Sequence, residues 1–501
     1  MELDIKSLYS YREDNRLEAK KAKTSLPNSI WETYSAFANT DGGIILLGVE
    51  EQKDKSLVVT GVEDAYKIMT DFWNIINNKQ KVSLNILTSR MVREETVDGK
   101  TVIVIEVPRA ERTIRPIYIG KDPVSGTYLR FWEGDHLCDK DQVSAFYRDA
   151  ASSTADMKVL KGLDVTFLDL QTVHDYRNCF DVRHRGHVWC KLDDEMFLRS
   201  IGAMGFDRED GKAYPTLAGL LMFGREYDIV RECPDYFLDY REIMESGIRW
   251  THRLVSSSGD WTGNLFDFFF RVYNRLKQAL SVPFKLDAEG ARIDDTPMHR
   301  ALREMIINTL AHADYFGRQG LVIIMRPDSL SFANPGDMRT GLKVALGGGT
   351  SDARNSSIMK MFGLLDFGER AGSGIPDLFD VCLSELDTEP QYSVTYSPAR
   401  TTMTIETARK SVVRETAPLG NEGYSRPYGL QKHYSKHTES LQKKYTDILT
   451  MVSQDGYITT TEMAEELGVS RQTVALRVKF LQEHGMLKRI GPDKGGYWKV
   501  M

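Results

Sequence analysis

The first part of the chain alternates between helical and extended hydrophobic patterns. Residues 31–39 are mostly apolar or small and predict a helix, and the two glycines after Asp41 predict a turn. The run 44–49 is continuously apolar, which predicts a buried strand, and residues 101–107 predict a second strand. This mixture predicts an α/β domain over residues 1–155.

Buried helices are the main prediction for the next part of the chain. A hairpin turn is predicted at residues 125–126, before a strand at 127–131. Beyond it, the run 217–223 is strongly apolar, and residues 264–280 place phenylalanines at near-helical spacing. These patterns predict core helices in a middle region, residues 156–290, that leads into the following module.

Helical and extended patterns alternate again from residue 291. A helix is predicted at 299–312, strands are predicted at 321–325 and 329–333, and glycine-rich turns follow. The order predicts an α/β sandwich over residues 291–407.

The last part of the chain divides into a linker and a small domain. Residues 408–436 are rich in proline and glycine, carry local basic charge and predict a linker. In residues 437–501, helices predicted at 441–452 and 461–467 precede a third helix, capped by Ser470, and then a hairpin. This order predicts a helix-turn-helix followed by a wing.

Composition limits what these domains can do. The chain has 501 residues, of which 41% are hydrophobic and 27% charged, as in a globular protein with about three or four domains. Because the formal net charge is −6, any nucleic-acid contact must come from local basic patches. The five scattered cysteines, the lack of a signal-peptide pattern and the lack of a long apolar run predict a cytoplasmic protein without a membrane span.

The C-terminal pattern resembles winged-helix transcription regulators. In that resemblance the third helix reads DNA, since arginine and glutamine can form paired hydrogen bonds to base edges in the major groove. Glu465, Glu466 and Glu483 keep the segment near neutral, so a protein-docking or dimerisation domain remains the alternative. The nucleic-acid contacts implied by the resemblance are Arg471, Gln472, Thr473, Arg477, Lys488 and Arg489.

Glu304 and Asn308 are four residues apart and share one face of the predicted helix, and His312 and Asp314 follow. The string 304–315 resembles the N-box in a divergent branch of the GHKL ATPases, which have a Bergerat fold. The resemblance implies that Asn308 would ligate a Mg²⁺ bridging the phosphates of ATP. It also implies that Glu304 would orient or deprotonate the attacking water.

Later motifs follow in the order of the same family. Asn334 and Gly336 match its first glycine box, Arg354 matches a recurrent Arg-Asn pair, and Gly372 and Gly374 match the later glycine box. The first box usually has an aspartate that accepts from the adenine amino group, and the amide of Asn334 accepts more weakly. The resemblance implies ATP and Mg²⁺ as cofactors. It leaves open whether ATP is hydrolysed and whether the module is a scaffold that has lost its nucleotide.

Two strings near the N-terminus resemble the divergent Alba-type domain of Schlafen-like proteins: residues 16–20, and residues 35–43 running into 47–51. Residues 115–118 and 127–130 continue the resemblance. Together with the GHKL-like module, this domain resembles a bacterial family described as ATP-binding, DNA-binding regulators. Some Schlafen-family members are RNA endonucleases that use three acidic residues.

Glu13, Glu18 and Glu51 match those acidic positions. Three converging carboxylates can hold a divalent metal and help activate water against a phosphodiester. Because Glu13 and Glu18 are five residues apart, their convergence needs a bend between them. The alternative is a set of solvated surface acids. The phosphate contacts hypothesised for this domain are Lys20, Arg112, Arg115 and Arg130.

Three functional hypotheses follow for this multidomain α/β and α+β chain. The first is a nucleic-acid-binding, ATP-binding regulator of transcription, expected to be a homo-oligomer, in which nucleotide shifts the placement of the flanking domains. The second is a metal-dependent Schlafen-like endoribonuclease that acts in stress or phage defence. The third is an ATP-dependent assembly protein whose winged helix docks another subunit.

Overall fold

The computed structural model has a multidomain, mixed α/β architecture and divides into two compact units, Met1–Arg409 and Lys410–Met501. Every helix among the described residues is too short or too polar to cross a membrane. The structure describes residues 11–407 except 12, 246, 280–284, 287–291, 294, 295, 350, 351 and 368–373, and from the second unit residues 448, 451, 452, 455, 457–467, 471, 474, 475, 478, 481, 487–490 and 497–500.

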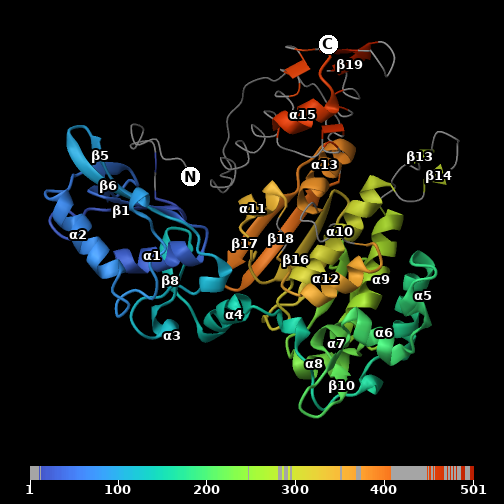
Figure 1. Ribbon diagram of the computed structural model, residues 1–501. Coiled ribbons are helices and arrows are strands. Elements are labelled where there is room, and N and C mark those ends of the chain that lie inside the picture. Colours follow the sequence, from blue (N-terminus) through green and yellow to red (C-terminus); the bar gives the residue numbers. More distant parts are fainter. Residues whose placement is uncertain are drawn as a thin grey trace. The chain divides into compact units, whose positions relative to one another are not determined.

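A four-stranded sheet of order β1-β2-β6-β5 forms the centre of the first domain (Figure 1). β1 runs parallel to β2, and β2, β6 and β5 are antiparallel neighbours. Alternate residues of β2 and β6 point into two separate hydrophobic clusters, one of which contains the buried faces of α1 and α2. The bounds are β1 Leu17–Lys20, α1 Ile30–Asn39, β2 Gly43–Leu47, β3 Val49–Glu51, β4 Leu57–Val59, α2 Ala65–Ile76, β5 Val92–Val97 and β6 Lys100–Val107.

Two glycines shape the chain on either side of β2. Gly42 has φ +69°, and a Cβ there would stand 2.7 Å from the Val107 carbonyl oxygen, so only glycine fits between α1 and β6. Gly48 has φ +86° and ends β2. The predicted single strand 44–49 is therefore divided between β2 and β3.

Residues 123–126 form a short helix, so the hairpin turn predicted at 125–126 is wrong. The Asp122 carboxylate caps this helix by accepting from the backbone N–H groups of Val124 and Ser125 at 3.1 and 3.2 Å. The hairpin lies further on, where Trp132 and Glu133 join β7 to β8. The bounds are α3 Pro123–Gly126, β7 Tyr128–Phe131, β8 Gly134–Leu137 and α4 Lys140–Ala150.

The middle region is mainly helical, as the apolar runs predict. α7 coincides with the predicted run 217–223, and α9 lies within the predicted segment 264–280. The bounds are α5 Leu170–Arg183, α6 Asp194–Ile201, β9 Met204–Phe206, β10 Ala213–Pro215, α7 Leu217–Phe223, α8 Glu226–Glu232, β11 Leu238–Glu242, β12 His252–Val255 and α9 Leu265–Ala279.

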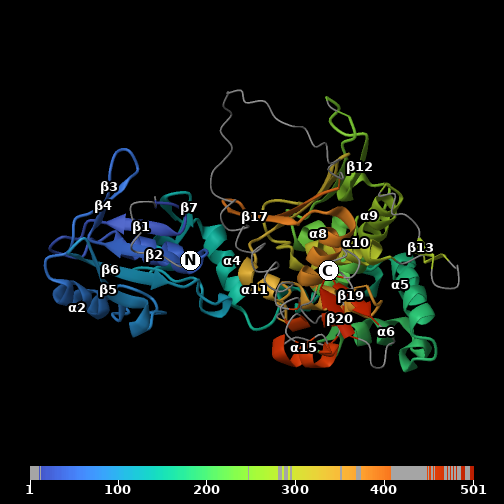
Figure 2. The same cartoon turned by 90° about the horizontal axis from the view of Figure 1, so that it is seen from above.

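A six-stranded sheet of order β12-β11-β15-β16-β18-β17 joins this middle region to the following module. Its two edge strands, β12 and β17, are labelled in Figure 2. β11 pairs in parallel with β15, and the two regions share one hydrophobic core in which α10 packs against α9, α12, α13 and β16. The bounds are β13 Lys285–Leu286, β14 Arg292–Ile293, α10 Pro297–His312, β15 Leu321–Met325, β16 Ser329–Pro335, α11 Leu342–Gly347, α12 Ser356–Gly363, α13 Gly374–Leu386, β17 Gln391–Tyr396 and β18 Ala399–Glu406.

The second unit contains its own small core, to which the segments of all three predicted helices and of the hairpin contribute. Val474, Val478 and Leu481 are buried together with Leu487 and Trp498. Arg471 and Ala475, the other described residues of the third segment, are exposed. The described elements are α15 Thr460–Leu467, β19 Leu487–Ile490 and β20 Tyr497–Val500.

Candidate functional sites

The bend required between Glu13 and Glu18 is present. Asp14 N donates to the Leu17 carbonyl at 3.3 Å, which reverses the chain immediately before β1. Glu13 Oε1 then accepts from the backbone N–H of Ala19 at 2.8 Å, beside Glu18. The turn therefore places the two carboxylates close together although neither a helix nor a strand would do so.

Glu51, at the end of β3, completes this group, which we call the carboxylate cluster (Glu13, Glu18 and Glu51). Burial, followed by the negative charges of Glu18 and Glu51, raises the pKa of Glu13 to about 7. The hydrogen bond from Ala19 and the charge of Arg130 oppose this rise and do not cancel it. In addition, Glu51 Oε1 is buried without a hydrogen-bond partner. The negative charge of the carboxylate cluster is thus only partly neutralised by the cations and hydrogen-bond donors around it.

Two cations contact Glu18. Arg130 Nη2 donates to Glu18 Oε2 at 2.7 Å, and its Nη1 donates to Asp135 Oδ1 at 2.9 Å. Lys20 Nζ donates to the other oxygen, Glu18 Oε1, at 2.8 Å. The Arg130 side chain is 1% exposed, so in this structure it holds Glu18 instead of facing solvent, and its contact with phosphate stays a prediction. Lys20 is occupied by the same carboxylate.

No group of three or more His, Cys, Asp or Glu side chains in the described part of the chain is arranged to hold a metal ion. The carboxylate cluster, as it stands, brings its members near enough to repel one another without forming a ready coordination cage. A bound divalent cation would require Glu18 to release Arg130 or Lys20.

Arg112 and Arg115 are also held in ion pairs, and their contact with phosphate stays a prediction. Arg115 Nη1 lies 3.2 Å from Asp337 Oδ2, and the Arg115 side chain is 1% exposed. Arg112 pairs with Asp352 and donates to the Asp149 carbonyl at 2.6 Å. Both arginines connect the first domain to the loops after β16 and before α12.

Helix α10 carries the motif that resembles the GHKL N-box. Thr296 caps the helix, which begins two residues before the predicted start at 299. Asn308 Nδ2 donates to Glu304 Oε1 at 3.1 Å, so the two side chains share one face as their spacing predicts. A Cβ on Gly374 would lie 2.2 Å from Glu304 Oε1, so the start of α13 approaches this face closely and a larger residue would make the Glu304 side chain move. Gly372 lies outside the described residues.

His312, Asn334 and Gly336 meet at the end of α10. Asn334 Nδ2 donates to the His312 carbonyl at 3.4 Å. Burial, and then the charge of Arg354, lowers the pKa of His312 to about 4, so this imidazole is neutral at physiological pH. Arg354 lies directly against Gly336, where a Cβ would stand 2.5 Å from Arg354 Nη1.

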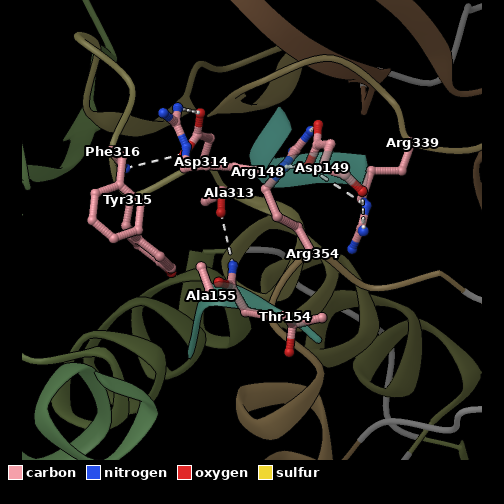
Figure 3. Close-up of a pocket in the computed structure, with 11 residues that line it drawn as sticks. Arg148, Asp149, Thr154, Ala155, Ala313, Asp314, Tyr315, Phe316, Arg339 and Arg354 are labelled. Carbon is pink, nitrogen blue, oxygen red and sulfur yellow. Dashed lines mark hydrogen bonds and ion pairs between the residues drawn. The ribbon is translucent and has the colours of Figure 1, made fainter. Parts of the chain in front are cut away.

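The C-terminal end of α4 enters this region and pairs with the predicted nucleotide-site residues (Figure 3). Arg148 Nη2 donates to Asp314 Oδ2 at 2.9 Å. Asp149 accepts from Nε and Nη2 of Arg354 at 2.9 and 2.8 Å, and Arg339 Nε lies 3.6 Å from the same carboxylate. We call this group the α4 junction.

Charge in the α4 junction is compensated. Burial alone would raise the pKa of Asp149, but the charge and hydrogen bonds of Arg354, together with Arg339, hold that pKa below its ordinary value. Arg354 also donates to the Asp337 carbonyl at 3.0 Å. Its predicted role as a direct nucleotide ligand therefore does not agree with its buried pairing in this conformation.

ATP and Mg²⁺ fit only one side of this region. Asn308, Glu304 and Gly374 offer an amide, a carboxylate and a closely approaching backbone, which suit a metal and phosphates. The cavity beside Asp314 and Arg354 measures about 20 Å³, which holds roughly one water. A nucleotide that used this side would have to displace the α4 junction.

The winged unit exposes cations on both the helix and the wing. Arg471 is exposed, whereas Gln472, Thr473 and Arg477 lie outside the described residues. Lys488 is exposed on β19 and stands directly opposite the exposed Lys499 of β20. Arg489 packs over the Trp498 ring, with its guanidinium carbon 4.6 Å from the ring centroid.

Sequence reasoning missed three residues of these sites. Arg148 and Asp149 lie outside every motif, and only the fold places them beside residues far along the chain. Lys499 could have been found from the sequence, because it follows the predicted wing turn on the strand that pairs with Lys488.

Family models match four successive parts of the chain. A model described as "Schlafen, AlbA_2" matches residues 13–139, and one described as "Putative ATP-dependent DNA helicase recG C-terminal" (HATPase_c_4) matches residues 319–405. A winged helix-turn-helix DNA-binding model matches residues 446–488, and a domain of unknown function, DUF8451, matches residues 144–239.

Comparison with whole proteins adds two solved structures. One is the DIP2311 protein of Corynebacterium diphtheriae, at 14% identity and a TM-score of 0.39, covering 97% of this chain and 95% of that one. The other is the N-terminal domain of a RecG-related protein of Nitrosomonas europaea, at 28% identity and a TM-score of 0.21, covering 26% of this chain and 88% of that one. A search of the curated proteins found no match.

Two of the matched models name DNA in their descriptions, the RecG C-terminal model and the winged helix-turn-helix model. The chain thus contains one segment that matches the Schlafen, AlbA_2 model, one that matches the RecG C-terminal model and one that matches a winged helix-turn-helix model.

Proposed function

We propose that the protein is a nucleic-acid-binding regulator whose winged helix contacts duplex DNA and whose ATPase-like module responds to nucleotide. The observation that carries the DNA contact is the Lys488–Lys499 pair. Two like charges directly opposite on an antiparallel pair destabilise the hairpin, and both side chains are exposed. Phosphate binding supplies the missing negative charge.

Salt-dependent DNA binding tests this proposal. Full-length protein and the double variant Lys488→Ala/Lys499→Ala are titrated against a labelled duplex at several salt concentrations. Each phosphate contact contributes about one unit to the slope of log K against log salt, so the double variant should lose roughly two units. Binding that is absent, or that is insensitive to salt in the wild type, would overturn the proposal.

A matched control uses Lys212→Ala, since Lys212 is an exposed lysine in the first unit. It should leave the salt slope unchanged. The double variant should fold at least as stably as the wild type, because it removes a repulsive cross-strand pair.

The α4 junction supports a nucleotide-dependent role for the ATPase-like module. In the proposal Asn308 and Glu304 would hold Mg²⁺ and the phosphates of ATP, and the bound phosphates would supply negative charge near Arg354. If Arg354 turned toward that charge, Asp149 would lose its principal partner, and the end of α4 would be released from the module. Nucleotide shifts the placement of the Schlafen-like domain because the junction exists in one arrangement and is broken in the other.

A second candidate function is a metal-dependent endoribonuclease, which the raised pKa of Glu13 favours. Strongly perturbed carboxyl groups in close company are typical of catalytic and metal-binding sites. Labelled tRNA, single-stranded RNA and duplex DNA are incubated with the wild type and with Glu18→Gln, in Mg²⁺ or Mn²⁺, with and without ATP.

Cleavage by the wild type, lost in Glu18→Gln and kept in Glu63→Gln, would establish the nuclease. Glu63 is a fair control because its side chain is 59% exposed and pairs only at the surface with Lys23. Cleavage that persists in Glu18→Gln would assign the activity to another site or to a contaminant.

A further inference from the structure

Trp132 stands out among the described side chains because it is 86% exposed. It occupies the first of the two residues that join β7 to β8, and the register pairs Phe131 with Gly134 across this turn. Burial of a tryptophan side chain contributes a large hydrophobic stabilisation to a folded protein, and Trp132 does not contribute it. The hairpin therefore presents the indole to solvent at its tip.

The backbone at this position is also strained. Trp132 has φ +56°, in the left-handed region, whereas Glu133 does not. Two-residue hairpins with positive φ at the first loop position strongly favour glycine there. In this turn the first loop position holds tryptophan, the bulkiest residue type, although glycine is preferred there. The nearest glycine, Gly134, lies two positions later. Strain without packing in return points to a function for the side chain.

The hairpin that carries Trp132 borders the carboxylate cluster through two ion-paired links. On β7, Arg130 holds Glu18, as described above. At the tip, Glu133 Oε2 lies 2.6 Å from Lys55 Nζ, and the same ammonium lies 3.2 Å from Glu51 Oε2. The residues on either side of the turn position Trp132 near the carboxylate cluster: Arg130 binds Glu18, and Glu133 is linked to Glu51 through Lys55.

Lys55 adds a second sign that this edge faces a ligand. It is a non-glycine residue with φ +69°, and its side chain is 47% exposed between the two glutamates. Lys55, which pairs with the chain neighbour of Trp132, offers a contact for a phosphate, and the exposed indole offers one for a flat ring. An apolar partner is a poor match, since the adjoining residues Glu133 and Lys55 are charged.

We infer that Trp132 is a stacking platform for an unpaired nucleobase, which holds a single-stranded segment of nucleic acid beside the carboxylate cluster. Every base has a π-face that stacks on an indole, so this contact tolerates sequence. A paired base within a duplex cannot offer that face, so the contact selects single-stranded over duplex nucleic acid. The inference rests on the proposed nucleic-acid binding and locates one contact of the Schlafen-like domain.

The test measures binding of the full-length protein to a short labelled RNA without secondary structure, to the matching single-stranded DNA and to a blunt duplex. Trp132→Ala should weaken binding of the single strands on the order of tenfold and leave duplex binding unchanged. Trp132→Phe should keep most of the affinity because phenylalanine can still stack. The RNA and DNA arms decide which single strand the platform prefers.

An abasic scan of the oligonucleotide sharpens the result. Removal of the one base that stacks on Trp132 should weaken binding by the wild type and have little further effect on Trp132→Ala. Removal of bases that do not stack there should weaken both proteins equally. Equal losses in both proteins at every position would overturn the inference.

Two further variants separate recognition from folding. Trp132→Gly removes the ring and relieves the positive φ, so it should lose single-strand affinity while its thermal midpoint is kept or raised. Tyr66→Ala removes an aromatic ring that is 82% exposed on α2, and it should bind like the wild type.

The outcomes distinguish this inference from the proposed function. If the wild type binds duplex DNA and single strands but Trp132→Ala binds single strands equally well, the platform is disproved and the regulator remains. If the wild type binds duplex DNA only, the platform is again disproved. If the wild type binds no nucleic acid, the proposed function fails and the platform fails with it.

Discussion

The carboxylate cluster and the α4 junction both bring several charged side chains together, yet their charge balance is opposite. In the cluster, Glu13 lies near Glu18 and Glu51, and its pKa is raised to about 7 because the negative charge is only partly met. In the junction, the pKa of Asp149 is lowered because Arg354 and Arg339 outweigh its burial. A site with uncompensated negative charge favours a proton, or a cation once Glu18 has released Arg130 or Lys20, whereas a fully paired site holds two domains together.

The largest effect is expected where compensation is complete. Asp149→Ala should leave Arg354 and Arg339 without their main carboxylate and should destabilise the first unit by about 3–5 kcal/mol. Chemical denaturation monitored by circular dichroism measures this loss. A loss under 1 kcal/mol would show that the junction is not structural, and would remove the contrast between the two regions.

Asp141→Ala is the matched control on the same helix. Asp141 pairs with Arg318 at the surface, where the two side chains are 57% and 71% exposed. An exposed pair of this kind contributes roughly 0–1 kcal/mol, so the variant should be nearly as stable as the wild type.

A divalent cation should stabilise the uncompensated region. At a Mn²⁺ concentration of about a hundred times the dissociation constant, binding to the folded state alone adds about 2.7 kcal/mol. The thermal midpoint of the wild type should therefore rise with Mn²⁺, and Glu13→Gln and Glu18→Gln should lose most of the rise. The same rise in all three proteins would place the cation elsewhere.

A smaller effect is expected from the titration of Glu13. Because its folded pKa is about 7 and its ordinary value is 4.5, the folded state holds more protons than the unfolded state between these values. Stability contributed by protonated Glu13 is therefore present at low pH and is lost as pH rises through this window.

Glu13→Gln removes the loss of stability with rising pH, because glutamine does not ionise. Its thermal midpoint should exceed that of the wild type by on the order of 1–3 °C at pH 8, and the difference should vanish near pH 4.5. Scans at intervals of pH measure the difference, with Glu63→Gln as an exposed control. A difference that stays constant with pH would contradict the charge repulsion described for the cluster.

Local patterns predicted much of this molecule because local physics decides it. The apolar run 217–223 is a helix because every side chain in it is buried, and Glu304 and Asn308 share a face because they are one helical turn apart. The matched family models agree with the order of domains that the motifs indicate. The predicted roles of Asn308, Asn334 and the recognition-helix residues in binding remain predictions.

The pairings that the sequence could not predict join side chains that lie far apart along the chain. Arg115 and Arg130 look like surface cations in the sequence, yet Asp337 and Glu18 bury them, at separations of 222 and 112 residues. Nothing near Asp149 in the sequence indicates that Arg354 is its partner. Such pairs are set by packing between elements, which no local periodicity contains.

Control by nucleotide is tested most directly by the DNA affinity of the full-length protein with and without ATP and Mg²⁺, measured by fluorescence anisotropy at fixed ionic strength. The affinity should shift about fivefold or more, since the coupling free energy between two linked sites is commonly about 1–3 kcal/mol. A much smaller shift is expected in Arg148→Ala/Asp149→Asn, where the α4 junction is already weakened. Equal affinity in both conditions for the wild type would contradict the proposal that nucleotide controls this protein through α4.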